Sequence, residues 1–253
     1  MPDHERRVLT LASPATTLVL GALLVLSTYA GRGPTAAAVL LTGVLVAFGW
    51  PTLLGLPSPK GVRAVLTAAA AACVLAALAE PGPDLRWLPV ALAVTLVGSF
   101  LHQLLRRDGR ARLVATLGGT ALGAGVLASG ACYVGVDAAS DGPVLVAITV
   151  LAAALSGLVD LAMHRTQHAE WALPLSMALG AAGGALLGVT QGSVDAVPGF
   201  ALGVASAGVS HAVRRVLTML SSARWPSAQV SVGAAALLLL GALPYAAAWL
   251  LQR

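Results

Sequence analysis

Nine apolar runs separated by short polar turns constrain the fold of this chain more than any other feature. An α-helix needs about 20 mostly apolar residues to cross the hydrocarbon core of a bilayer. The runs cover residues 8–30, 35–51, 62–80, 87–105, 112–136, 142–163, 171–190, 195–217 and 228–251. The second and third runs are short and rich in alanine, so a partial or tilted span remains open for each. The pattern predicts an all-α, polytopic transmembrane helical bundle of about nine spans.

The composition indicates that lipid, and not water, surrounds most of the chain. Of the 253 residues, 58% are hydrophobic and 10% are charged, whereas a soluble domain carries about a quarter charged residues. The longest polar connection is about a dozen residues, so we expect residues 1–253 to form a single transmembrane domain. We divide it provisionally into residues 1–111, with spans one to four, and residues 112–253, with spans five to nine. Cys73 and Cys132 lie far apart in apolar runs, which favours packing residues over a disulfide framework or a zinc site.

The basic residues predict the orientation in the membrane. With a cytoplasmic N-terminus and nine spans, the outside segments contain only Arg32, Arg86 and Arg253 of the 15 Lys and Arg residues. The inside segments contain Arg6, Arg7, Lys60, Arg63, Arg106, Arg107, Arg110, Arg112, Arg165, Arg214, Arg215 and Arg224. This asymmetry follows the positive-inside rule and predicts an outside C-terminus. Because the basic residues sit in turns between spans, the net charge of +5 does not indicate nucleic-acid binding.

Small residues and tryptophans predict how the spans pack and where they end. Glycines recur four residues apart, which lets helix backbones approach closely and favours packing inside one bundle over homodimerisation. The repeats are Gly180, Gly184 and Gly188, Gly119 with Gly123, and Gly199 with Gly203. The five tryptophans lie at predicted span ends, the position of membrane-interface anchors. They are Trp50, Trp87, Trp171, Trp225 and Trp249.

Asp160 is the one carboxylate that lies inside a predicted span wherever the span boundaries are placed. An aspartate at the centre of a membrane helix costs about 2.5–3.5 kcal/mol on insertion scales, so it marks a functional position by default. Asp160, His164 and His168 are four residues apart and share one helix face. They suggest a metal site, but Asp160 and His168 lie about 12 Å apart along a continuous helix. Helix geometry therefore disfavours one shared metal ion, and we predict no metal and no cofactor.

The remaining polar side chains gather at the predicted cytoplasmic ends of the spans. They are His102, Arg106, Arg107, Ser210, His211, Arg214 and Arg215, which join Asp160, His164 and His168 in one candidate headgroup-binding rim. In the first interpretation, arginines bind the phosphate of a lipid headgroup through bidentate hydrogen bonds. In the second, the arginines only set the topology and touch anionic lipid without specificity, with Asp160 paired to one of them. No nucleophile elbow, phosphate-binding loop or zinc-protease motif is present.

The C-terminal half resembles the bacterial CDP-diacylglycerol synthases (phosphatidate cytidylyltransferases). The matching pieces are Tyr133-Val134-Gly135, Asp160 with Ala162, His168, Ser176, Gly180 to Gly188, Ser210 with Arg214 and Arg215, and Pro244 with Tyr245. After Ser176 come Met177, Ala178 and Leu179, where the family has lysines. After Arg215 the family's lysine–aspartate pair and D-R-x-x-D acids are absent. Cytidylyl transfer needs carboxylates that hold magnesium, so the resemblance implies a synthase-like scaffold that has lost catalysis.

These observations predict a noncatalytic, multi-pass protein of a bacterial plasma membrane. It would bind an anionic lipid or polyprenyl-phosphate headgroup at the inner leaflet, or dock another membrane protein. The alternatives are a small-molecule permease and a divergent cytidylyltransferase-like enzyme. The chain also resembles the integral membrane proteins and permeases of actinobacteria. Apart from membrane lipids and that possible protein partner, we expect no partner, and in particular no nucleic acid.

Overall fold

The structure, a computed structural model, describes residues 3–79, 83–106, 112–136, 141–163, 166 and 169–251, with side chains from residue 12 onward. These residues form α-helices and two short 3-10 helices, and they contain no strand. The elements are α1 (Asp3–Ala30), α2 (Arg32–Leu53), α3 (Pro59–Leu78), α4 (Leu88–Leu105), α5 (Leu113–Val136), α6 (Gly142–Met163), η1 (Ala169–Trp171), α7 (Ala172–Gln191), α8 (Ala196–Thr218), η2 (Ser221–Arg224), α9 (Pro226–Leu239) and α10 (Ala242–Leu251).

Nine helical segments within the described ranges are long and apolar enough to cross a membrane. Helices α1 to α8 each provide one, with η1 extending α7, and α9 and α10 together provide the ninth. The two short, alanine-rich runs form complete helices of 22 and 20 residues. The predicted all-α, polytopic membrane bundle is confirmed, and the helices begin and end within a few residues of the predicted positions.

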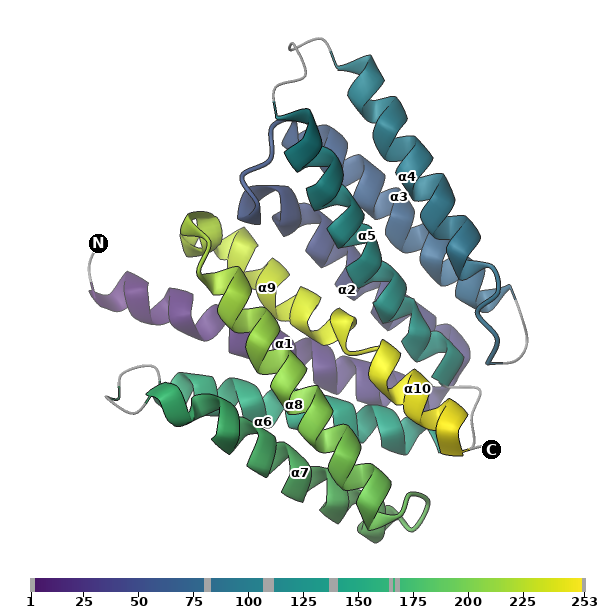
Figure 1. Cartoon of the computed structure of the whole chain (residues 1–253), viewed down its shortest axis with the longest axis vertical. Helices are drawn as coiled ribbons and strands as arrows, with labels where there is room; N and C mark the ends of the chain where they lie inside the picture. Colours follow the sequence, from purple (N-terminus) through teal and green to yellow (C-terminus); the bar gives the residue numbers. More distant parts are fainter. Residues whose placement is uncertain are drawn as a thin grey trace.

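Two groups of helices flank a central pair (Figure 1). Helices α6, α7 and α8 pack together on one side, and α2, α3, α4 and α5 pack together on the other. Between them, α1 contacts α2 and α6, α9 contacts α2, α5 and α8, and α1 and α9 contact each other. Residues after 112 are thus divided between the groups, because α5 packs with α2 to α4.

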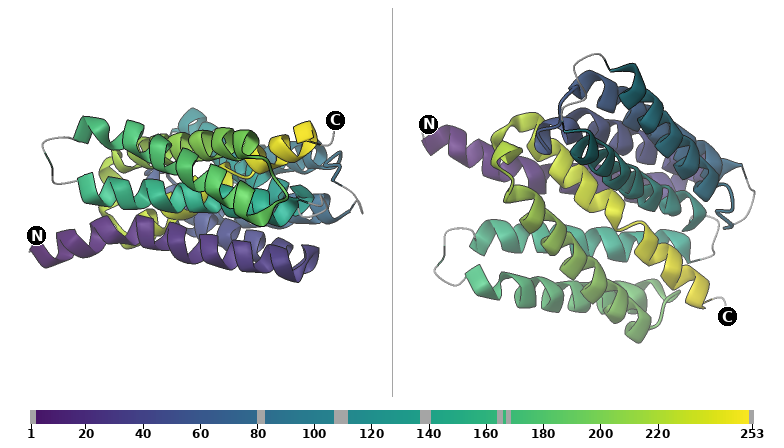
Figure 2. Two further views of the ribbon diagram at one scale, coloured as in Figure 1. Left: turned by 90° about the horizontal axis from the view of Figure 1, so that it is seen from below. Right: turned by 45° about the horizontal axis from the view of Figure 1, so that its top comes forward.

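The start of α1 and the ends of α6 and α8 lie on the same side of the bundle (Figure 2). There Arg112, just before α5, donates from Nη1 to the carbonyl of Gly55, between α2 and α3, at 2.8 Å. At the opposite end, Arg32 of α2 donates from Nη2 to the carbonyl of Ala77 in α3 at 2.5 Å. We call the first end the predicted cytoplasmic face, because the basic residues assign the start of α1 to the inside.

Helices α7 and α8 pack closely along a seam of glycines. A Cβ atom at Gly180 would lie 2.6 Å from the carbonyl oxygen of Gly203, and one at Gly199 would lie 2.5 Å from that of Gly184. Real side chains do not tolerate such distances, so only glycine allows this approach. Close backbone contact adds dispersion and weak hydrogen bonds in lipid, where burial gives no hydrophobic advantage. The predicted use of the repeat for packing inside one bundle is confirmed for these helices.

The ninth predicted span, residues 228–251, is not one continuous helix. Helix α9 ends and α10 begins around Leu240 and Gly241, which form a turn. Pro244 explains the break, because it has no backbone N–H and its ring clashes with the preceding helical turn. Gly241 lies against the carbonyl of Ser129 in α5, where a Cβ atom would overlap that oxygen. The predicted ninth span is confirmed in its extent, and the turn divides it into two helices.

Side chains of α5 satisfy backbone groups that the break exposes. Ser129 Oγ donates to the carbonyl of Leu239 at 2.7 Å and accepts the N–H of Ala242 at 3.2 Å. The hydroxyl of Tyr133 donates to the carbonyl of Leu237 at 3.0 Å. Broken helices persist in membranes when neighbouring helices supply such bonds. The break is therefore a packed joint between α5, α9 and α10.

We expect Ser129→Ala to lower the free energy of unfolding by about 2 kcal/mol, because two backbone groups lose their partner in an apolar environment. Thermal unfolding in detergent micelles measures the change. Thr190→Ala is the matched control, since the Thr190 hydroxyl is exposed and bonds to its own helix. That control should change stability by less than about 0.5 kcal/mol. Equal losses in both variants would contradict the role of Ser129 at the joint.

Four of the five tryptophans have exposed side chains near helix ends, as membrane-interface anchors require. They are Trp87, Trp171, Trp225 and Trp249. Trp50 differs, because its side chain is 1% exposed and its Nε1 donates to the carbonyl of Gly119 at 2.8 Å. The interface prediction was wrong for Trp50, which is a core residue that ties α2 to α5.

Candidate functional site

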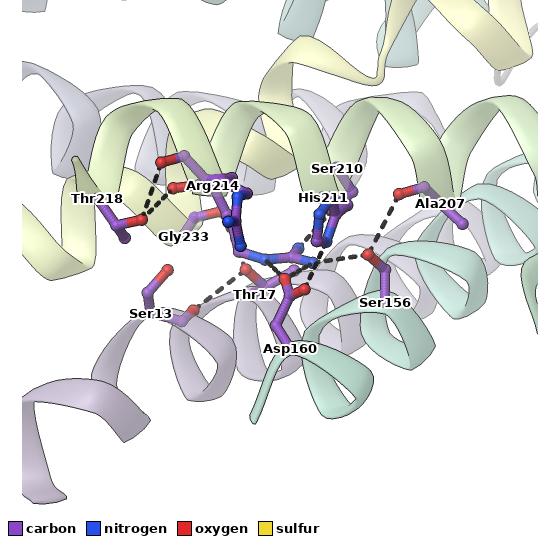
Figure 3. Close-up of polar contacts among 11 residues, drawn as sticks. Ser13, Thr17, Ser156, Asp160, Ala207, Ser210, His211, Arg214, Thr218 and Gly233 are labelled. Atoms are coloured by element: carbon purple, nitrogen blue, oxygen red, sulfur yellow. Dashed lines mark hydrogen bonds and ion pairs between the residues drawn. The ribbon is translucent and has the colours of Figure 1, made fainter. Parts of the chain in front are cut away.

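The candidate site is built on two pairs of polar residues spaced four apart on neighbouring helices. Ser156 and Asp160 lie on one face of α6, and Ser210 and Arg214 lie on one face of α8. Because α6 and α8 pack against each other, the two faces meet (Figure 3). The i, i+4 spacing places each serine one turn from the charged residue of its own helix.

Arg214 binds Asp160 and both serines. Its Nε and Nη2 atoms donate to Asp160 Oδ2 at 3.0 and 2.7 Å. Nη2 also donates to Ser156 Oγ at 2.7 Å, and Nη1 donates to Ser210 Oγ at 2.5 Å. Ser156 Oγ itself donates a hydrogen bond to the carbonyl of Ala207 at 3.2 Å. These bonds use four of the five N–H groups of the guanidinium.

His211 completes the surroundings of the carboxylate. Its Nδ1 lies 2.5 Å from Asp160 Oδ1, and because an ionised carboxylate only accepts hydrogen bonds, Nδ1 is the donor. Asp160 Oδ2 thus accepts two bonds from Arg214, and Oδ1 accepts one from His211. Each carboxylate oxygen has room for about two bonds, so Oδ1 retains one acceptor position.

The two side chains of the Asp160–Arg214 ion pair are buried to different extents. The Arg214 side chain is 4% exposed, whereas that of Asp160 is 24% exposed. A buried guanidinium is costly unless an opposite charge and hydrogen bonds compensate it. Asp160 compensates Arg214, and its exposed part borders a cavity.

The cavity has a volume of about 380 Å³ and opens between α1, α6 and α8 at the predicted cytoplasmic face. Its apolar wall consists of Pro14, Leu161, Met163, Ala169 and Ala172. Its polar wall consists of Ser13, Asp160, His211, Arg214, Arg215, Thr218 and Gln229. The cavity is therefore amphipathic.

Arg215 and Ser13 are the two polar lining residues whose side chains make no hydrogen bond within the described chain. The Arg215 side chain is exposed and makes no ion pair or hydrogen bond within the described chain. Ser13, on α1, is 3% exposed, and its Oγ has no hydrogen-bond partner among the described residues. Arg215 provides a free positive charge, and Ser13 provides a free hydroxyl.

The structure brings together part of the rim that the sequence predicts. Asp160, Ser210, His211 and Arg214 form the network, and Arg215 joins them at the cavity. Arg107, His164 and His168 lie outside the described residues. The hypothesis of a metal ion held by Asp160, His164 and His168 depends on these two histidines and therefore stays a prediction.

The end of α4 forms a separate polar cluster. His102 Nε2 lies 3.5 Å from Ser58 Oγ, and its ring packs against Gly61 of α3. Arg106 donates from Nη1 to Gln103 Oε1 at 2.7 Å. None of these residues lines the cavity, so the predicted single rim is two clusters. Helix α4 packs with α3 and α5, away from α6 and α8.

Sequence reasoning missed four residues of the site. Ser156 precedes Asp160 by four residues inside an apolar run, and that spacing was a usable signal. Thr218 follows Arg214 by four residues on α8 and carries the same signal. Ser13 and Gln229 gave no such signal, because α1 and α9 reach the cavity only through tertiary packing. No family model, no curated protein and no solved structure matches this chain.

Proposed function

We propose that this multi-pass membrane protein binds the phosphate of an anionic lipid headgroup in the cavity between α1, α6 and α8, without catalysing a reaction on it. The observation that carries the proposal is the unpaired guanidinium of Arg215 on the cavity wall. A guanidinium binds phosphate oxygens through charge-assisted hydrogen bonds, which are stronger than neutral ones. Arg214 is not the binding group, because Asp160 and two serines occupy it.

The balance of charge supports an anionic ligand. Among the lining residues, Asp160 carries one negative charge, and Arg214 and Arg215 carry two positive charges. Since Asp160 and Arg214 compensate each other, Arg215 leaves the cavity with an excess of one positive charge. The inner leaflet is the membrane surface where basic residues meet anionic lipids.

The shape and location of the cavity support an amphipathic ligand. About 380 Å³ is within the usual range for small-ligand sites. The apolar wall of Pro14, Leu161 and Met163 would contact the part of a lipid next to its phosphate. A polyprenyl phosphate shares this chemistry. We also propose that the protein lies in a bacterial plasma membrane. Docking of another membrane protein at this face is the other form of the proposal.

The carboxylate chemistry favours binding over catalysis. Asp160 is the one carboxylate among the described lining residues, and Arg214 and His211 already bind it. Phosphoryl and nucleotidyl transfer require carboxylates free to hold metal ions. We therefore expect no product from CTP and phosphatidic acid in a cytidylyltransferase assay. Formation of CDP-diacylglycerol would replace this proposal with the divergent-enzyme alternative.

A permease is the second candidate, and the break between α9 and α10 favours it. Broken helices often form the substrate sites of transporters through their free backbone ends. Here Ser129 and Tyr133 of α5 already bind carbonyls of α9. The cavity also opens at the helix ends of one face. Both observations make binding at that face the better-supported function.

We expect Arg215→Ala to weaken the binding of anionic lipid about tenfold or more. A hydrogen bond to a charged group contributes about 1.5–3 kcal/mol, and 1.4 kcal/mol corresponds to a factor of ten. The measurement is lipid retention by native mass spectrometry of detergent-purified protein titrated with phosphatidylglycerol and with a polyprenyl phosphate.

Arg224→Ala is the matched control for Arg215→Ala. Arg224 is also exposed near the predicted cytoplasmic face but lies beside Trp225, away from the cavity lining. It should leave lipid binding unchanged within about twofold. Equal effects of the two substitutions would show that anionic lipid is attracted to the basic face without a specific site, and the proposal would fail.

A further inference from the structure

We infer that the ligand is a phosphodiester whose headgroup carries hydroxyls, as the glycerol headgroup of phosphatidylglycerol does. This inference rests on the proposed function and names the chemical class that the same cavity would select. Its basis is the set of hydrogen-bonding groups on the polar wall apart from Arg215.

The first of these groups is the hydroxyl of Ser13. Its neighbours Thr16 and Thr17 donate to the carbonyls four residues before them, at 2.7 and 3.1 Å. Ser13 makes no such bond, although it is 3% exposed and lines the cavity. Buried hydroxyls normally have a partner. Figure 3 shows Ser13 on α1 facing α8 across the site. A ligand in the cavity would provide the missing partner.

The other groups are mainly acceptors. Asp160 Oδ1 retains one acceptor position after binding His211. The Thr218 hydroxyl directs its hydrogen at carbonyls of its own helix, 2.7 Å from that of Arg214, so toward the cavity it can only accept. Gln229 donates one Nε2 hydrogen to the carbonyl of Ala223 at 2.6 Å, which leaves its Oε1 as an acceptor and its second Nε2 hydrogen as a donor.

A phosphate alone does not match this wall. It would satisfy the donors of Arg215 and Ser13, but a phosphate diester presents only acceptors to Asp160, Thr218 and the Oε1 atom of Gln229. Headgroup hydroxyls donate hydrogen bonds and therefore complement those three residues. An ammonium headgroup also donates, but it would bring a positive charge into a cavity that already has an excess of one. A hydroxylated, uncharged headgroup fits both the charge and the acceptors.

The test compares two lipids of equal charge. Phosphatidylglycerol and phosphatidylmethanol with the same acyl chains are both phosphodiesters, and only the first has headgroup hydroxyls. We expect full-length protein to bind phosphatidylglycerol about tenfold more tightly in native mass spectrometry. Ser13→Ala should reduce that preference at least threefold, while Arg224→Ala should leave it unchanged. Because Ser13 Oγ has no partner to lose within the described chain, this variant should unfold at no lower temperature than the parent.

The outcomes separate this inference from the proposed function. Equal, Arg215-dependent binding of both lipids would overturn the preference for hydroxyls and leave phosphate binding intact. Binding of neither lipid would overturn both. Soluble glycerol 3-phosphate carries a phosphate and hydroxyls without acyl chains. If it competes at concentrations similar to that of the lipid, the preference for a hydroxylated phosphate is supported, and the ligand is a soluble molecule. No competition by it, together with a preference for phosphatidylglycerol, would identify the lipid.

Discussion

Asp160→Ala is expected to lower the free energy of unfolding by about 3 kcal/mol, the largest loss from a single substitution in the site. Removing one partner of a buried ion pair leaves the other charge without compensation, which costs about 3–5 kcal/mol. The lower end applies here because Asp160 is 24% exposed, although Arg214 is only 4% exposed. Thermal unfolding of detergent-purified protein measures the loss.

The double variant Asp160→Ala/Arg214→Met gives the decisive comparison. Methionine fills much of the volume of the arginine stem and removes the buried charge, so the double variant should recover at least half of the lost stability. Arg214→Met alone completes the double-mutant cycle. If the double variant were as unstable as the sum of the single variants, Asp160 and Arg214 would be energetically independent and the buried ion pair would have no structural role.

Gly203→Ala is expected to cost about 2–3 kcal/mol, the second large effect. A Cβ atom at this position would overlap the carbonyl oxygen of Gly180, so α7 and α8 would have to separate. Overpacking of a close-packed interface typically costs 1–3 kcal/mol, and here a rigid backbone atom is the obstacle. The unfolding midpoint in detergent and protease sensitivity between α7 and α8 measure the effect.

Gly125→Ala is the control for the glycine seam. Gly125 lies within α5, and a Cβ atom there would meet nothing within 4 Å. Because alanine favours a helix over glycine by up to about 1 kcal/mol, this variant should be as stable as the parent or slightly more stable. A loss at Gly125 equal to that at Gly203 would show that the effect comes from the helices themselves and not from their contact.

The membrane-spanning helices could be predicted from the sequence because lipid imposes a simple length and composition on each of them. The break around Gly241 was missed because hydropathy alone does not register Pro244, which leaves the run apolar. The burial of Trp50 was missed because its partner, the carbonyl of Gly119, lies on another helix. The first feature comes from a residue inside the apolar run itself, and the second from a residue distant in the chain.

The site was predictable to a similar extent. An aspartate in an apolar run needs a partner, and Arg214 and His211 were among the predicted rim residues. Which of the rim residues bind Asp160 depends on the rotation of α8 against α6, and a sequence does not specify that rotation. Ser13 illustrates the remaining difficulty, because a serine in a membrane helix is ordinary until α1 brings it to the cavity.

The ion pair also bears on how the protein enters the membrane. Asp160 and Arg214 are 54 residues apart, so during synthesis α6 reaches the bilayer before α8 exists. For that interval the carboxylate has no arginine partner, at a cost of about 2.5–3.5 kcal/mol if it is drawn to mid-bilayer depth. Helix α6 has the highest mean hydropathy of the nine membrane-spanning segments in the described chain, which offsets this cost. We expect the arrival of α8, which brings Arg214 beside Asp160, to remove this cost.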